Sequence, residues 1–145
     1  MAYAHVGHDS VIHNHTILVN NAALAGHVEV GDYAILSGYT LVHQFCSIGA
    51  HAFTGMGTAV GKDIPAYVVA NGSPASAYNI NIEGLKRRGF NSDTIATLRK
   101  AYKVVYRQGL TIDEACQRLQ QMQQSCPEVG LLLQSLQASK RGIVR

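Results

Sequence analysis

The chain has 145 residues, enough for one or two small domains with a modest core. Because 47% of the residues are hydrophobic and 7% are aromatic, the composition excludes a disordered chain and indicates aliphatic packing. No apolar run approaches the roughly 18 residues that a membrane-spanning helix needs, and the first residues do not resemble a signal peptide. The three cysteines show no metal-binding spacing, so we expect a reduced, cytoplasmic protein.

The net charge of +3 is unevenly distributed along the chain. Residues 1–78 contain one base and four acids, a balance of −3, whereas residues 79–145 contain eleven bases and five acids, a balance of +6. A basic surface suits an acidic carrier protein, a phosphate-bearing small molecule or a nucleic acid, although a solvated helix face explains it equally well.

A six-residue period organises the chain from Val6 to about Pro65. Nine of its ten slots are aliphatic and only Thr54 breaks the series: Val6, Ile12, Leu18, Leu24, Val30, Leu36, Val42, Ile48 and Val60. A strict hexapeptide repeat of this kind is typical of a parallel β-helix, in which the aliphatic slot points inward and stacks on its equivalent in the next coil. We therefore predict a hexapeptide-repeat β-helix over residues 1–65.

Three hexapeptides form one coil, so residues 18 positions apart should stack in columns about 4.8 Å apart. This arithmetic puts His8, Gly26 and Gln44 in one column, with neighbouring columns that contain His27 and His43. Four side chains that can take part in chemistry therefore fall on one small patch: His8, His27, His43 and Gln44. His5 lies just before this patch, at a corner. The other histidines, at positions 13, 15 and 51, are expected to be ordinary surface residues.

After Val60 the repeat decays, and Pro65, Gly72 and Pro74 indicate a connecting segment over residues 66–80. This segment is expected to run off the end of the prism that the coils of the β-helix form. Residues 81–145 have a helical pattern and form a predicted helical domain. The expected helices are a short one that stops at Gly89, a second capped by Ser92, a third opened by the capping box of Thr111 and Glu114, and a last one that starts at Pro127.

The histidine patch has the chemistry of an acyl-transfer site. His8 is a natural general base near neutral pH, and the adjacent Asp9 can orient its ring if a turn or a subunit boundary brings the two together. Gly26, stacked on His8, leaves a backbone N–H for an oxyanion. No serine or cysteine is placed as a nucleophile, which favours direct attack by a hydroxyl substrate on a thioester. Incidental stacking of turn histidines, or a zinc site of three histidines near a subunit interface, are the alternatives.

Several segments resemble the family of UDP-N-acetylglucosamine O-acyltransferases, over essentially the whole chain. They are HVGHDS at 5–10, ILVNNAALAGHVEVGDYAILSG at 17–38, TLVHQFCSIGAHAF at 40–53, NIEGLKRRGF at 81–90 and AYKVVYRQG at 101–109. The resemblance implies a cytoplasmic homotrimer with a left-handed parallel β-helix and a C-terminal helical domain. It implies transfer of an (R)-3-hydroxyacyl group from acyl carrier protein to the 3-hydroxyl of UDP-N-acetylglucosamine, the first step of lipid A biosynthesis.

The resemblance also implies roles for individual residues. His8 would be the general base, Asp9 its partner and Gly26 the oxyanion donor. The substrate site between subunits would be lined by His5, His27, His43 and Gln44. The nucleotide would be bound by Asn81, Glu83 and one or both of Arg87 and Arg88. The basic helices would receive the acidic carrier protein. The family needs no cofactor or metal, and no nucleic acid is expected as a partner.

Two departures from the family pattern give further expectations. Met56 stands where a glycine goes with longer acyl chains, so we predict a shorter donor of about ten carbons. Met1 matches an internal position of the family, so the chain keeps a little over three coils and should be a truncated product or a fragment. The alternatives to the acyltransferase are a zinc-dependent hexapeptide-repeat enzyme and a non-catalytic trimeric scaffold.

Overall fold

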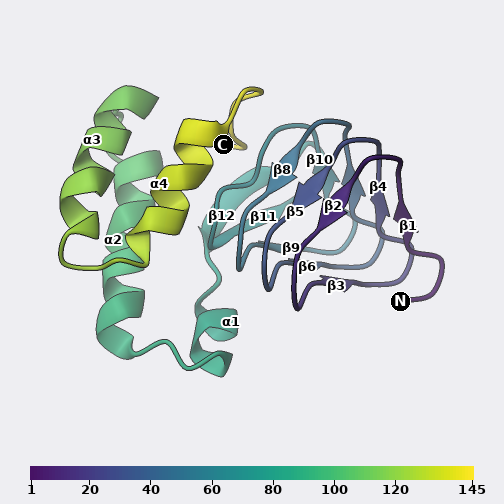
Figure 1. Ribbon diagram of the computed structural model, residues 1–145, viewed down its shortest axis with the longest axis horizontal. Coiled ribbons are helices and arrows are strands. Elements are labelled where there is room, and N and C mark those ends of the chain that lie inside the picture. The colour runs from purple at the N-terminus through teal and green to yellow at the C-terminus, as the bar shows by residue number, and fades with distance from the viewer.

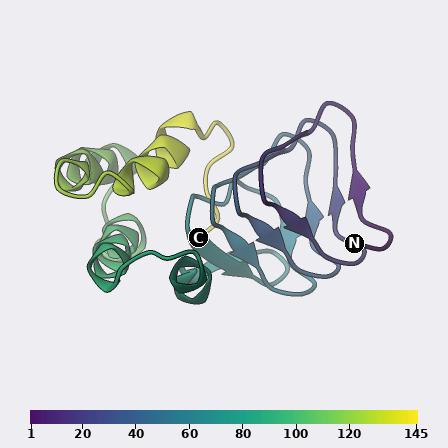
Figure 2. The same cartoon turned by 60° about the horizontal axis from the view of Figure 1, so that its bottom comes forward.

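A computed structural model of the protein describes residues 1–145, which form a coiled β-structure with a group of helices at one end (Figure 1). Ten strands of two residues recur every six residues: β1 His5–Val6, β2 Val11–Ile12, β3 Ile17–Leu18, β4 Ala23–Leu24, β5 Glu29–Val30, β6 Ile35–Leu36, β7 Leu41–Val42, β8 Ser47–Ile48, β9 Phe53–Thr54 and β10 Ala59–Val60. The turns between them give the prism the triangular outline seen in Figure 2. The predicted β-helix is therefore confirmed.

The strands form three parallel sheets, one for each side of the prism. Sheet A has the order β1-β4-β7-β10, sheet B the order β2-β5-β8, and sheet C includes β3, β6 and β9. His5 pairs with Ala23 and Val6 with Leu24, so each coil contains 18 residues, as the period predicted. The aliphatic slots from Leu24 onward are buried and form the core of the prism.

The slot residues of the first coil are less covered than the rest. Val6 is 45% exposed, and Ile12 and Leu18 are half-buried, because strands β1, β2 and β3 each pair with a neighbour on one side only. Thr54, the one polar slot, is fully buried, and its hydroxyl lies 2.8 Å from the Thr40 hydroxyl.

Each corner turn holds one residue in the left-handed region, again with a period of six. The non-glycine residues with positive φ within the repeat are Tyr3, Asp9, His15, Asn21, His27, Tyr33, Tyr39, Phe45 and His51. Asn, Asp and His tolerate this conformation better than most residues. Several of the rings stack along one corner: His15 on Tyr33, Tyr33 on His51 and His51 on Tyr67. Each turn therefore directs a side chain outward at a corner of the prism.

The segment 66–80, predicted as a connection that leaves the prism, contains a β-hairpin. Strands β11 (Val68–Asn71) and β12 (Ser76–Ile80) pair antiparallel, and β11 also pairs in parallel with β9, so the hairpin extends sheet C. The prolines are compatible with it because Pro65 precedes the first strand and Pro74 lies in the turn.

Four helices follow: α1 Ile82–Arg87, α2 Ser92–Tyr106, α3 Ile112–Gln123 and α4 Val129–Ala138. The predicted capping box of Thr111 and Glu114 is present at α3. Two predicted boundaries are wrong: Asn91, not Ser92, caps α2, since its side chain accepts from the Thr94 N–H, and α4 starts at Val129 rather than at Pro127. No helix has the length and apolar character needed to cross a bilayer.

Candidate active site

His8 and Asp9 lie in the first corner turn, between β1 and β2, and form a hydrogen-bonded pair. The His8 Nδ1 lies 3.0 Å from the Asp9 Oδ2. Asp9 has a positive φ of 58°, and this left-handed backbone conformation makes the turn that brings the two adjacent side chains together. The hydrogen bond from His8 and the charge of His27 lower the pKa of the Asp9 carboxyl, so this group is a carboxylate that can only accept. Nδ1 therefore carries the proton, and Nε2 has the free lone pair of a base.

Gly26 lies directly against the other edge of the His8 ring. A Cβ atom at Gly26 would be 2.6 Å from both Cε1 and Nε2 of His8, so any side chain there would displace the ring from this position. The Gly26 N–H has no acceptor within the chain. The predicted column of His8 over Gly26 is therefore present, with an unpaired backbone donor beside the free nitrogen of the histidine.

His27 completes the cluster from the next coil. Its Nε2 lies 3.7 Å from the Asp9 Oδ2, and its ring meets that of His8 edge to face with centroids 5.1 Å apart. On its other side it stacks on Phe45, with centroids 4.8 Å apart. The ligand atoms of His8, Asp9 and His27 lie within 4.8 Å of one another, so this cluster could also hold a metal ion.

The other predicted substrate residues of the prism are exposed, and Gln44 continues the predicted column of His8 and Gly26, since the Phe45 N–H donates to the Gly26 carbonyl as the His27 N–H donates to the His8 carbonyl. His5 was predicted at a corner, but it lies in strand β1, on one side of the prism. His43 follows β7, and Gln44 lies in the corner turn after it. The His43 Nδ1 donates to the Gln44 carbonyl, 3.0 Å away, and His43 lines a shallow hollow with Pro74. Met56 is 81% exposed at the corner between sheets C and A.

The predicted nucleotide residues are gathered at α1. Glu83 and Arg87 are exposed, whereas Asn81 and Arg88 are engaged within the chain. Asn81 caps α1 by accepting from the Gly84 N–H, and its Nδ2 donates to the His51 carbonyl. The Arg88 Nη1 donates to the His51 ring at 3.0 Å.

His51 was expected to be an ordinary surface residue, and this prediction is wrong. It is only 7% exposed, because α1 and Phe90 cover its corner of the prism. Burial and the Arg88 charge lower its pKa to about 4. The hexapeptide period predicts the column of a residue but not which later segment covers it. His13 and His15 are exposed as expected.

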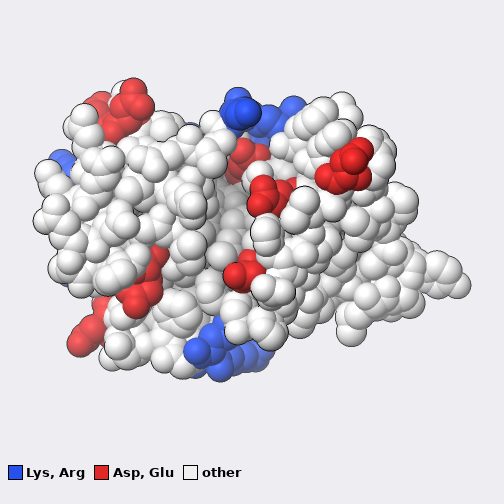
Figure 3. All heavy atoms as spheres, viewed as in Figure 1, with Lys and Arg blue, Asp and Glu red and all other residues white.

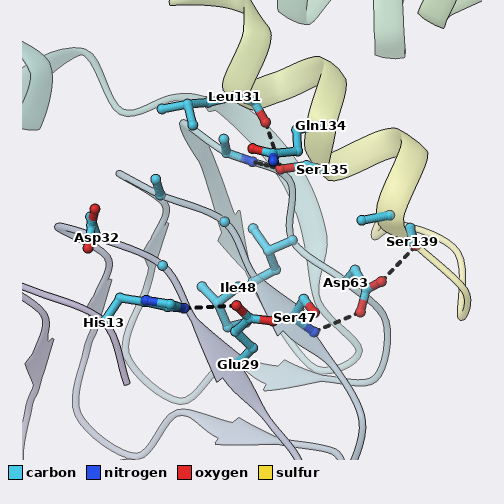
Figure 4. A pocket seen from close by; sticks show the side chains of 16 residues that line it. His13, Glu29, Asp32, Ser47, Ile48, Asp63, Leu131, Gln134, Ser135 and Ser139 are labelled. Carbon is cyan, nitrogen blue, oxygen red and sulfur yellow. Dashed lines mark hydrogen bonds and ion pairs between the residues drawn. The ribbon is translucent and has the colours of Figure 1, made fainter. Parts of the chain in front are cut away.

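A groove of about 370 Å³ separates sheet B from α4, and it contains none of the predicted site residues (Figure 4). In Figure 3 carboxylates gather along this groove, with basic side chains at its two ends, over α1 and over the C-terminal tail. The carboxylates have partners: Glu29 binds His13 at 2.8 Å, Asp32 accepts from a backbone N–H, and Asp63 accepts from Ser139 at 2.7 Å. The groove is therefore a polar seam that helps to hold the helices on the prism.

Comparison with known proteins identifies the family. Residues 63–144 match the family model described as UDP N-acetylglucosamine O-acyltransferase, domain 2. The acyl-[acyl-carrier-protein]–UDP-N-acetylglucosamine O-acyltransferase of Pseudomonas entomophila is 66% identical over all 145 residues, which are 56% of its length. Among solved structures, the UDP-N-acetylglucosamine acyltransferase of Francisella novicida matches with a TM-score of 0.97 and 41% identity, over 100% of this chain and 53% of that one. The enzyme of Moraxella catarrhalis matches with a TM-score of 0.96 and 42% identity, over 98% and 55%.

The fold is a left-handed parallel β-helix followed by a helical domain, as the sequence resemblance implied. The chain belongs to the UDP-N-acetylglucosamine O-acyltransferase family. It spans about half the length of the curated relatives that it matches.

Proposed function

We propose that the chain is the catalytic and carrier-binding part of an acyltransferase. It would transfer an (R)-3-hydroxyacyl group from acyl carrier protein to the 3-hydroxyl of UDP-N-acetylglucosamine, the first step of lipid A biosynthesis. The observation that carries this proposal is the His8–Asp9 pair, whose free Nε2 lies against Gly26. The relatives are named for this donor and acceptor, which supports the same reaction.

In the proposed mechanism His8 Nε2 removes the proton of the sugar hydroxyl as its oxygen attacks the thioester carbonyl carbon. The new C–O bond moves an electron pair onto the carbonyl oxygen, which the Gly26 N–H would stabilise. Collapse of this intermediate breaks the C–S bond, and the thiolate takes the proton back from the His8 imidazolium. Asp9 stabilises the imidazolium through the 3.0 Å hydrogen bond to Nδ1.

Replacing the base tests this proposal. The purified chain is assayed for acyl transfer to UDP-N-acetylglucosamine, beside His8→Ala and the control His15→Ala. His15 is a second exposed turn histidine with no contact to Asp9. We expect His8→Ala to lose about 100-fold or more in rate and His15→Ala to retain the activity. Equal rates for the two variants would remove His8 from the mechanism. An inactive wild-type chain with intact trimers would favour the scaffold alternative.

The proposal also assigns binding roles. His5, His27, His43 and Gln44 would line the sugar and acyl site between subunits, since they are exposed on or beside sheet A. Asn81, Glu83, Arg87 and Arg88 would bind the nucleotide from α1. The basic helices would bind the acidic carrier protein, because residues 79–145 carry a balance of +6. The three free cysteines are consistent with action in the cytoplasm.

A homotrimer would bring these groups together. The His8–Asp9 pair lies at the corner between sheets A and B, whereas Arg88 contacts His51 at the corner between sheets B and C. A single nucleotide sugar that reaches both corners therefore needs a second copy of the chain. Light scattering should give a mass close to three times 15.6 kDa, and a monomer that still transfers acyl chains would contradict the proposal.

Met56 is proposed as the residue that limits the length of the acyl chain, to about ten carbons. It is 81% exposed on the single chain, as a side chain that meets a substrate or a neighbouring subunit must be. Met56→Gly should shift the preferred donor to longer chains, measured as kcat/KM over a series of hydroxyacyl carrier proteins. An unchanged optimum would reduce Met56 to a packing residue.

The zinc-dependent alternative has one observation in its favour, the cluster of His8, Asp9 and His27. Two histidines and a carboxylate form a common zinc ligand set. Elemental analysis of the purified protein separates the two functions. Stoichiometric zinc that is lost in His27→Ala would support a metalloenzyme, whereas activity that survives a chelator supports the acyltransferase.

A further inference from the structure

A single residue of the prism, His51, holds both ends of helix α1. At the start of the helix, the Asn81 side chain caps Gly84 and donates through Nδ2 to the His51 carbonyl, 3.1 Å away. At the end of the helix, the Arg88 Nη1 donates to the His51 Nδ1, 3.0 Å away. The backbone and the ring of one residue therefore fix the helix at its two caps.

The His51 ring is held rigidly by aromatic neighbours. It stacks on Tyr33 with centroids 5.1 Å apart and on Tyr67 at 5.6 Å, and the edge of Phe90 contacts it at 5.2 Å. With 7% of its surface exposed, the ring has little freedom to rotate. Its acceptor nitrogen therefore points in one direction, toward the guanidinium of Arg88.

The charge state of the ring fits an acceptor role. Burial, and secondarily the Arg88 charge, lower the pKa of His51 to about 4, while Asp32 opposes them. At neutral pH the ring is uncharged, so Nδ1 keeps the lone pair that accepts from Arg88 and the other nitrogen carries the proton.

Arg88 is a half-buried cation without an anionic partner. Its two contacts are the neutral His51 ring and the face of Tyr33, whose centroid is 5.2 Å from the guanidinium carbon. No carboxylate lies within 4.0 Å of any lysine or arginine of the chain. Arg87 and Lys86 add further positive charge in the last turn of α1. A guanidinium that is partly desolvated, fixed in direction and left unneutralised is suited to bind a phosphate.

We propose that His51 is a positioning residue that orients Arg88 for a nucleoside diphosphate bound at the end of α1. This inference rests on the proposed function for its ligand, but the geometry of the His51–Arg88 pair is independent of it. His51 itself would not contact the nucleotide. Removing its acceptor should therefore weaken nucleotide binding through Arg88 and leave the acyl-transfer chemistry at His8 unaffected.

Two substitutions separate the acceptor of His51 from its packing. His51→Phe keeps a ring in the stack but removes the acceptor, whereas His51→Asn removes the ring but places a carbonyl oxygen near the position of Nδ1. Both residues suit the local backbone, because His51 has a φ of 61° and the equivalent turn residues Phe45 and Asn21 have φ values of 65° and 62°. His15→Phe is the matched control, since His15 stacks on Tyr33 at another turn.

The readout is the dissociation constant of UDP, measured by calorimetry on the 145-residue chain. We expect His51→Phe to bind UDP about tenfold more weakly or worse, as for a lost hydrogen bond to a charged group. His51→Asn and His15→Phe should stay within about threefold of the wild type. In the acyl-transfer assay, His51→Phe should have a higher KM for the nucleotide sugar than the wild type, with little change in kcat.

An Arg88→Met background tests whether His51 acts through Arg88, and it guards against general damage to the fold. There His51→Phe should cause no further loss of UDP affinity, whereas an added tenfold loss would overturn the inference. Binding by His51→Phe that equals the wild type would also overturn it. So would binding by His51→Asn that is weaker than by His51→Phe, since that order indicates packing alone.

Inorganic pyrophosphate distinguishes failure of this inference from failure of the proposed function. If the wild type binds pyrophosphate but not UDP, and the variants keep the expected order, the nucleotide assignment fails while the positioning role is supported. If the wild type binds neither ligand, the anion site and with it this inference are refuted.

Discussion

Acid should destabilise the folded chain through His51. The ordinary pKa of a histidine, 6.5, applies in the unfolded chain, whereas the folded value is about 4. Between these values the unfolded state takes up a proton that the folded state does not, so the free energy of unfolding falls as the pH is lowered. Below about pH 4 both states are protonated and the effect levels off. The shift of 6.5 minus 4 corresponds to about 3 kcal/mol, at about 1.4 kcal/mol for each pH unit.

Urea or thermal unfolding at a series of pH values between 7 and 4, followed by circular dichroism, measures this loss. For a chain of this size, about 3 kcal/mol corresponds to roughly 10 °C in the melting temperature. His51→Phe should lack this component, whereas the control His15→Phe should follow the wild type. Other acid-sensitive groups, such as the Asp9 carboxylate with its lowered pKa, are common to all three proteins and cancel. If the free energy of unfolding falls equally with decreasing pH for the wild type and His51→Phe, the reasoning is refuted.

Two further substitutions test the core and the site. Gly26→Ala would place a Cβ 2.6 Å from the His8 ring, so we expect the rate of acyl transfer to fall about 100-fold. The melting temperature should change little, because the buried core sets it. Initial rates and a thermal melt measure the two effects. Thr54→Val removes a buried hydroxyl 2.8 Å from that of Thr40 and should destabilise the chain by about 1–3 kcal/mol in denaturant unfolding. A stable Thr54→Val variant would show that the core accepts the unpaired Thr40 hydroxyl.

The prism and the central pair of the candidate site could be predicted from the sequence because both follow from one local period. Eighteen residues per coil fixes the pairing of His5 with Ala23, and the same count places His8 over Gly26. The contact between His8 and Asp9 needed a turn or a subunit boundary, and the period did not decide between the two. Asp9 has the required positive φ.

The rest depends on contacts between segments far apart in the sequence. His51 is buried because α1 and Phe90 fold back over its corner, a contact that spans 37 residues between His51 and Arg88. The hairpin β11–β12 was missed because its prolines indicate a break, although they flank the strands and do not interrupt their pairing. Hydrophobic periodicity describes each coil but contains no information on which later element covers it.

The two histidine corners of the prism show how one repeated turn can serve two different roles. Asp9 and His51 occupy equivalent turn positions, with φ values of 58° and 61°. At the first corner no other element of the chain covers the turn, so the His8–Asp9 pair stays open to solvent, with side-chain exposures of 75% and 67%. At the second corner α1 covers the turn, so His51 becomes an internal acceptor that fixes Arg88. The backbone supplies the same outward-pointing position every six residues, and the covering element decides whether the side chain at that position stays exposed or becomes buried.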